Sequence, residues 1–177
     1  MLHLSNPFIK LLLPAIGIIA VYLIVTKRLR YSLKDDLLLV APDLGILFLW
    51  IAVYLAYMLG TDLWMNWRGD WNFQPWKEQS LLVSAARILA VGIFGPILEE
   101  LIFRGLILKK LTTLKLGKWL SLFIVSALWA AIHVDYSAAV ITLLFFDGIL
   151  LGLSLYHSRS LVVPMILHMI WNLYAVW

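Results

Sequence analysis

The chain has 177 residues, of which 63% are hydrophobic and 14% are charged, and its mean hydropathy is +0.95. A soluble domain is closer to half apolar and a quarter charged, so the composition excludes an ordinary water-soluble fold and indicates one integral membrane domain spanning residues 1–177. The absence of cysteine excludes disulfides, thiolate metal sites and a cysteine nucleophile.

The first apolar run, residues 7–26, is long enough to cross a bilayer as a helix. A cleavable signal peptide has a basic start, a short apolar core and a small-residue cleavage site. Here the basic residues Lys27, Arg28 and Arg30 follow the run instead. We therefore expect a retained transmembrane helix.

Five further apolar segments follow, each close to the length of a spanning helix. They cover residues 37–60, 81–108, 118–134, 137–156 and 160–177. Backbone polar groups must be satisfied within lipid, so long continuous runs favour helices over barrel strands. The sequence predicts an all-α, polytopic transmembrane bundle of about six helices. In the third segment, Gly92, Gly95 and Pro96 predict a kink or break just before Glu99.

The connectors between the segments differ strongly in basic residues, with nine on one side and three on the other. The nine lie in residues 27–36, 109–118 and 157–159, and the three are Lys10, Arg68 and Lys77. The positive-inside rule places the first group in the cytoplasm and both termini outside. The small size fits a prokaryotic plasma membrane. Because the basic residues cluster at the ends of apolar runs, the net charge of +4 does not indicate a nucleic-acid partner.

The longest connector, residues 61–79, is rich in tryptophan: Trp64, Trp67, Trp71 and Trp76. Tryptophan favours the headgroup zone of a bilayer. The connector is therefore interpreted as an interfacial anchor, and alternatively as a lid or substrate-docking surface on the outer face.

The third segment contains three charged residues at a depth where charge is costly. Glu99, Glu100 and Arg104 lie 6 to 11 positions before Lys110, roughly 10–16 Å from the cytoplasmic end of a helix. Glu100 and Arg104 are four positions apart and can pair on one face, whereas Glu99 points about 100° away. One carboxylate can then stay ionised while the other exchanges a proton. The alternative is a buried salt bridge that only fixes helix packing.

Two further segments each contain a histidine. His133 follows Trp129 by four positions in the fourth segment, and His168 precedes Asn172 by four positions in the sixth. The imidazole and carboxamide of the second pair project into the same space, which suits the stabilisation of developing negative charge. Interhelical hydrogen bonding is the alternative for both histidines.

Together these residues form a set that can activate water: a carboxylate base, an imidazole and oxyanion donors. The sequence contains no serine nucleophile motif and no His-Glu-x-x-His motif. A divalent ion bound by the glutamates and histidines is an alternative to a metal-free site. Asp147, in the fifth segment, can pair with Arg87 or orient a histidine.

These residues resemble the CPBP family, the CAAX-protease and bacteriocin-processing intramembrane endopeptidases, also called Abi proteins. The family has three motifs, Glu-Glu-x-x-x-Arg, Phe-x-x-x-His and His-x-x-x-Asn. They are matched in order by Glu99, Glu100 and Arg104, by His133 with Trp129 in place of phenylalanine, and by His168 and Asn172. The resemblance covers residues 85–177, which would form the catalytic core.

The resemblance implies a helical bundle with a water-filled cavity, in which Glu99 and His133 activate the hydrolytic water. The Glu100–Arg104 pair would support them, and the two residues of the third motif would form the oxyanion hole. By the same resemblance no metal or other cofactor is needed, with a divalent metal at the Glu/His site as the alternative.

The implied activity is an intramembrane endopeptidase acting on a membrane protein or peptide, with a C-terminal sorting or anchor segment as one class of substrate. One alternative is a non-enzymatic immunity or scaffold protein, which predicts loss of the motif residues. Another is a small proton-coupled transporter, which predicts two related halves. All polar motif residues are present, and no internal repeat is visible. The sequence does not determine the oligomeric state.

Overall fold

A computed structural model describes residues 7–70, 80–114 and 116–176, and every regular element in these ranges is a helix. The elements are α1 (Pro7–Leu23), η1 (Ile24–Arg28), α2 (Leu44–Met65), η2 (Trp67–Asp70), α3 (Leu81–Arg87), η4 (Ile88–Phe94), α4 (Gly95–Glu100), η5 (Leu101–Leu108), α5 (Lys109–Thr113), α6 (Lys118–Ala131), α7 (Ala138–Ser158) and α8 (Val162–Val176). Of these, η1, η4 and η5 are π-helical and η2 is a 3-10 helix.

Four helices in the described residues are long and apolar enough to cross a bilayer. They are Phe8–Arg28, Leu44–Met65, Leu81–Thr113 and Ala138–Ser158. α6 and α8 are also apolar but contain only 14 and 15 residues. The prediction of an all-α transmembrane bundle is confirmed, and each of the six predicted segments overlaps one of these helices.

The second helix begins at Leu44, whereas the apolar run predicted a start at residue 37. Asp43 is its N-cap, and the Asp43 side chain accepts a hydrogen bond from the backbone N–H of Ile46 at 2.9 Å. Before it, Arg30 and Leu38 both have a φ of 56°, a left-handed conformation that a continuing helix cannot contain. Because apolar residues continue through these turns, the prediction from apolar composition put the start of the helix too early.

The third helix does not break before Glu99. It runs from Leu81 to Thr113, through the π-helical η4 and η5. Within η4 the backbone N–H of Gly95 donates to the carbonyl of Ala90, five positions earlier, and Pro96 occupies the start of α4. A proline is tolerated at the first turn because its missing N–H is not needed there. The predicted kink or break is therefore not a break in the helix. The chain changes instead to π-helical hydrogen bonding, which is one of the known causes of helix kinks.

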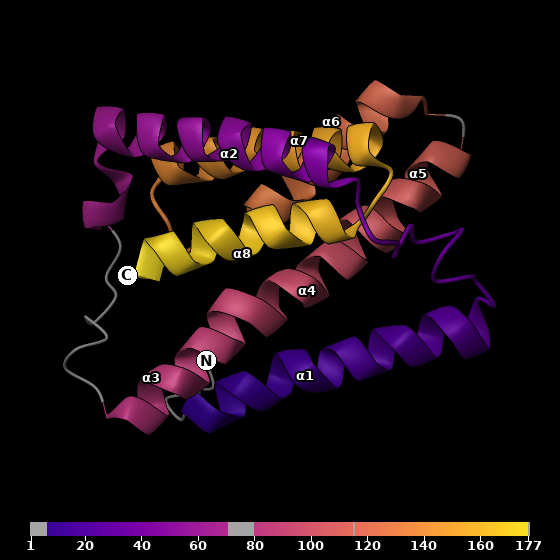
Figure 1. The fold of residues 1–177 in the computed structure, drawn as a ribbon, viewed down its shortest axis with the longest axis horizontal. Coiled ribbons are helices and arrows are strands. Elements are labelled where there is room, and N and C mark those ends of the chain that lie inside the picture. The colour runs from indigo at the N-terminus through magenta and orange to yellow at the C-terminus, as the bar shows by residue number, and fades with distance from the viewer. Residues whose placement is uncertain (1–6, 71–79, 115, 177) are drawn as a thin grey trace.

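The third helix crosses the bundle diagonally, with α1 on one side of it and α8 on the other (Figure 1). α2, α6 and α7 cover the far side of α8 (Figure 1). α8 approaches η4 closely, since a methyl group added at Gly92 would lie 2.6 Å from Leu173 Cδ2. This close contact fixes the helices that carry Glu99 and His168 against each other.

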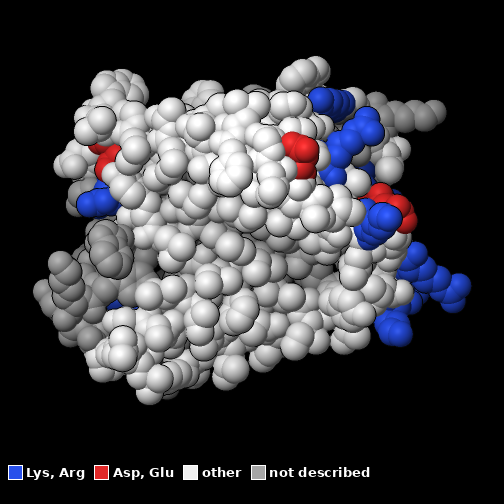
Figure 2. Space-filling model, in the orientation of Figure 1, with Lys and Arg blue, Asp and Glu red and all other residues white. Residues whose placement is uncertain are grey.

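α1 begins and α8 ends at the same end of the bundle, as the even number of predicted segments requires (Figure 1). On the face shown in Figure 2, most Lys and Arg side chains gather at the opposite end. That end is formed by the connectors after η1, α5 and α7. The connectors that are rich in basic residues therefore lie together at one end of the folded molecule.

The irregular residues 29–43 are attached to the bundle by side-chain bonds. Lys109 Nζ forms an ion pair with Asp36, and Ser160 Oγ donates to the carbonyl of Val40 at 2.6 Å. The backbone N–H of Leu161 also donates to the carbonyl of Leu38 at 2.9 Å. The segment thereby closes the basic end of the bundle over η5 and α8.

This attachment predicts a pH dependence of stability. The Lys109 ammonium, together with the Ser32 backbone N–H, holds the pKa of Asp36 below its ordinary value. The ion pair therefore stabilises the fold above the ordinary carboxylate pKa, and this contribution is lost as the pH falls through the lowered pKa. We expect Asp36→Asn to lower the thermal unfolding midpoint slightly at pH 7. The difference from the wild type should disappear in strong acid.

The matched control is Asp35→Asn. Asp35 is exposed and accepts a hydrogen bond from Ser32 Oγ, and the structure shows no ion pair for it among the described residues. Unfolding of the detergent-solubilised protein would be followed across pH for both variants. Equal midpoints for Asp36→Asn and the wild type at pH 7 would contradict the prediction.

Candidate active site

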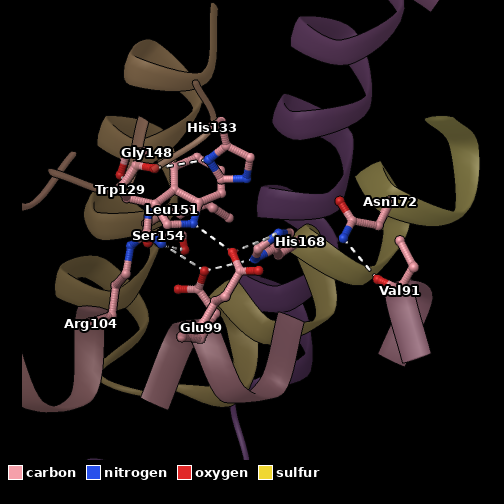
Figure 3. Close-up of polar contacts among 11 residues, drawn as sticks. Val91, Glu99, Arg104, Trp129, His133, Gly148, Leu151, Ser154, His168 and Asn172 are labelled. Atoms are coloured by element: carbon pink, nitrogen blue, oxygen red, sulfur yellow. Dashed lines mark hydrogen bonds and ion pairs between the residues drawn. The ribbon is translucent and has the colours of Figure 1, made fainter. Parts of the chain in front are cut away.

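A cavity of about 180 Å³ lies between the third helix, α6 and α8. Most of the polar residues that the sequence analysis identified as candidates line it. Its lining residues are Val91, Glu99, Trp129, His133, Tyr136, Leu144, His168, Trp171 and Asn172. Figure 3 shows Glu99, Trp129 and His168 on one side and Asn172 beyond His168. The cavity is large enough for several water molecules.

Behind this cavity, Glu100 forms a buried polar network. Glu100 Oε1 accepts hydrogen bonds from Arg104 Nη1 at 2.8 Å and from His168 Nδ1 at 2.9 Å. Arg104 Nη2 donates to the carbonyl of Gly148 at 3.1 Å. The side chains of Glu100 and Arg104 are completely buried, and Glu100 does not line the cavity. The pair expected from the four-residue spacing is present, and it also orients His168.

Glu99 has a different environment from Glu100, its neighbour in sequence. Its side chain is 29% exposed and lines the cavity. Its Oε2 accepts a hydrogen bond from Trp129 Nε1 at 2.7 Å and lies 3.9 Å from His168 Nε2. One carboxylate is therefore locked in a buried ion pair, and the other faces space that water can enter. Two carboxylates in such different environments can have different roles.

His133 lies at the rim of the cavity and not on a helix. α6 ends at Ala131, although the apolar run predicted helix to residue 134. His133 Nδ1 lies 2.9 Å from the carbonyl oxygen of Trp129, and since a carbonyl can only accept, Nδ1 donates. In the neutral imidazole Nε2 is then an acceptor. Tyr136 stacks on the ring, with centroids 5.9 Å apart.

Asn172 is held by the third helix. Its Nδ2 donates to the carbonyl of Val91 in η4 at 2.9 Å, so the amide turns toward that helix (Figure 3). An amide nitrogen has two hydrogens, which leaves one donor beside the cavity. His168 Nδ1 is occupied by Glu100, so its Nε2 is the atom that faces Glu99 and the cavity. Both residues of the third motif thus have one nitrogen left for a ligand.

Asp147 is completely buried, and among the described residues neither of its oxygens has a partner within hydrogen-bond geometry. It is therefore not paired with Arg87, one of the two roles considered for it. Its electrostatic neighbours are Tyr54, His168 and Arg104. Its position behind His168 is compatible with the other role, the orientation of a histidine.

The tryptophan-rich connector is only partly the surface that its composition predicted. Trp64 is on α2 and 81% exposed, as an interfacial residue would be. Trp67 is instead buried, with its ring stacked on Trp171 at a centroid distance of 4.7 Å. Trp71 and Trp76 lie outside the described residues. Trp171 and Tyr136 also line the cavity and had no motif to reveal them.

Among the described residues, no group of three or more His, Cys, Asp or Glu side chains is placed to hold a metal ion. Glu99, Glu100 and His168 are close in space, but Glu100 Oε1 already has two donors. Glu100 and His168 are therefore hydrogen-bonded to each other, and Glu100 also to Arg104.

Comparisons with known proteins identify the family of the chain. The family model described as "Type II CAAX prenyl endopeptidase Rce1-like" matches residues 81–174, more than half of the chain. The chain is also 30% identical over 109 residues to a protein of Staphylococcus aureus (strain USA300) named "Membrane-embedded CAAX protease MroQ". This match covers 56% of the chain and 43% of that relative, so the chain spans less than half of the relative's length. No solved structure gives a significant match.

Proposed function

Because the chain belongs to the Rce1-like family of type II CAAX prenyl endopeptidases, we propose that it hydrolyses a peptide bond of a membrane-associated protein or peptide within the bilayer. The observation that carries the proposal is the exposure of Glu99 to a small polar cavity beside His133 and His168. The buried Glu100–Arg104 pair supports this cavity from behind.

In the proposed reaction, a water molecule in the cavity donates a hydrogen bond to Glu99 and another to His133 Nε2. Glu99 takes a proton from the water as the oxygen attacks the carbonyl carbon of the substrate peptide bond. The resulting oxyanion accepts hydrogen bonds from Asn172 Nδ2 and from Nε2 of a doubly protonated His168. Glu99 then returns the proton to the leaving amine as the C–N bond breaks. A general base typically contributes about 10²–10⁴-fold, and one oxyanion donor about 10²–10³-fold.

The rival functions fit the structure less well. A proton-coupled transporter needs polar groups in a path across the membrane, whereas here Glu99, His133 and His168 converge on one cavity. An immunity or scaffold protein has no need to keep the polar motif residues, and all of them are present. The substrate class we favour is a membrane protein with a C-terminal sorting or anchor segment.

The direct test uses the purified protein in liposomes with two probes. One is a peptide ending in a farnesylated Cys-aliphatic-aliphatic-X sequence, and the other is a transmembrane peptide with a C-terminal anchor segment. Mass spectrometry would detect the products. We expect cleavage of at least one probe by the wild type and of neither by Glu99→Ala. Absence of cleavage by the wild type, or equal cleavage by both proteins, would overturn the proposal.

We also propose an orientation in which the basic end of the bundle is cytoplasmic. His133 and Tyr136 lie in the connector between α6 and α7, at the opposite end from the basic loops, so the cavity would be reached from outside. The chain has no native cysteine, and single cysteines at the exposed positions Lys110 and Asp135 can therefore report the topology. An impermeant thiol reagent should label Asp135→Cys from outside intact cells and Lys110→Cys only after lysis. Labelling of both from one side would contradict the orientation.

A further inference from the structure

Trp129 contacts four residues of the candidate site, Glu99, Arg104, His133 and His168. It stands at a position where the second motif of the resembling family has phenylalanine. It is 1% exposed, and its Nε1 donates to Glu99 Oε2 at 2.7 Å. The guanidinium carbon of Arg104 lies over its ring, 4.7 Å from the centroid. The rings of His133 and His168 each meet it nearly edge-on, with centroids 5.2 Å apart.

The indole also holds the guanidinium of Arg104 on its face. Arg104 has Glu100 as its ion-pair partner and does not line the cavity, whereas Trp129 does. Tryptophan has the most favourable ring face for a cation, so this contact favours the position of Arg104 beside Glu100. At the ring edge, the N–H gives Glu99 a donor of its own. A hydrogen bond to a charged carboxylate is stronger than one between neutral groups.

From these contacts we propose that Trp129 is a positioning residue that fixes the Glu99 carboxylate through its indole N–H and thereby sets the rate of hydrolysis. With Oε2 held by the indole, Oε1 is the oxygen left to accept the proton of the attacking water. Phenylalanine can fill the same space but cannot donate this hydrogen bond. The inference rests on the proposed function and adds a positioning residue to it.

The test compares two variants that each remove a buried indole N–H. Trp129→Phe removes the donor to Glu99. Trp67→Phe is the control, because Trp67 is 1% exposed and its Nε1 donates to Thr61 Oγ1 at 3.3 Å, but it does not line the cavity. Hydrolysis of the more rapidly cleaved liposome probe would be measured at several concentrations, together with the thermal unfolding midpoint.

We expect kcat of Trp129→Phe to fall by roughly tenfold or more, since small displacements of a reacting group are costly. KM and the unfolding midpoint should change no more than in Trp67→Phe, whose kcat should match the wild type. A loss of packing alone would lower the midpoint and the amount of folded protein instead. Full kcat in Trp129→Phe, with an active wild type, would overturn the inference while the proposed function stands.

A second measurement detects the contact without relying on activity. The chain has nine tryptophans, and NMR of protein labelled with ¹⁵N at the indole nitrogen gives one signal for each. The Trp129 signal is identified by its loss in Trp129→Phe. It should shift in Glu99→Gln, whereas the Trp67 signal should not. An unmoved Trp129 signal would overturn the inference. A shifted signal in a protein that cleaves neither probe would show that the contact exists and that the proposed function fails.

Discussion

Replacing Glu99 with glutamine is expected to remove nearly all hydrolytic activity and to leave the fold intact. Glutamine has the shape of glutamate and keeps a carbonyl oxygen that can accept the Trp129 indole hydrogen bond. It cannot take a proton from water near neutral pH. Loss of a general base costs typically ~10²–10⁴-fold in rate. The variant should therefore unfold at the same temperature as the wild type and differ only in kcat.

Glu100→Gln provides the comparison that separates the two adjacent carboxylates. Glu100 accepts hydrogen bonds from both Arg104 and His168 and does not line the cavity. Its replacement should lower stability and reduce activity together, because Arg104 loses its charged partner. Rates from mass spectrometry and unfolding midpoints would be measured for both variants. Full activity of Glu99→Gln combined with inactive Glu100→Gln would reverse the assignment, and normal cleavage with both replaced would exclude a hydrolytic role for either.

Arg104→Ala is expected to cause the largest loss of stability of any single substitution in the site. The side chains of Arg104 and Glu100 have no exposure, and Arg104 also donates to the carbonyl of Gly148. Removal of one member of a buried ion pair leaves the other charge uncompensated, which costs about 3–5 kcal/mol. Membranes should contain less folded protein, and the fraction that folds should have low activity because Glu100 no longer holds His168 in the same geometry.

The double variant Glu100→Gln/Arg104→Met shows whether this loss comes from the stranded charge. With both charges removed, most of the stability lost in Arg104→Ala should return, because neutral side chains of similar size often replace a buried ion pair without cost. Activity should remain low, since His168 would still lack its charged partner. The unfolding midpoint in detergent measures the first effect, and probe cleavage measures the second. An unfolding midpoint of Arg104→Ala equal to that of the wild type would show that the pair does not stabilise the fold.

Local patterns predicted the fold well, and contacts between distant residues were not predictable. Run length identified six helices, and the spacing of four residues identified the Glu100–Arg104 pair. The bond between Glu100 and His168 joins positions 68 residues apart, and no spacing rule predicts it. The start of the second helix was missed because apolar residues continue through the turns before Asp43, although an aspartate N-cap after Pro42 was a usable signal.

The environment of aromatic residues was the least predictable part of the site. Tryptophan is common both at interfaces and in packed cores, so composition could not show that Trp67 would be buried on Trp171 while Trp64 stays exposed. For Trp129, the motif resemblance indicated only that it stands in place of phenylalanine. Its indole N–H became important only because the fold places Glu99 at 2.7 Å from it.

When Leu81–Thr113 is taken as one helix, α6 and α8 are the two shortest apolar helices that the structure describes in the bundle. α6 leads to His133, and α8 contains His168. α6 and α8 have 14 and 15 residues, which corresponds to about 21–23 Å at 1.5 Å per residue. The hydrocarbon core of a bilayer is about 30 Å thick. The exposed apolar side chains of α6 would face lipid, whereas most of α8 is buried or half-buried within the bundle. We therefore expect the bilayer to thin beside α6, which brings water closer to the cavity than the number of spans suggests. Activity should then depend on acyl-chain length, because thicker bilayers increase the hydrophobic mismatch at the helix that leads to His133.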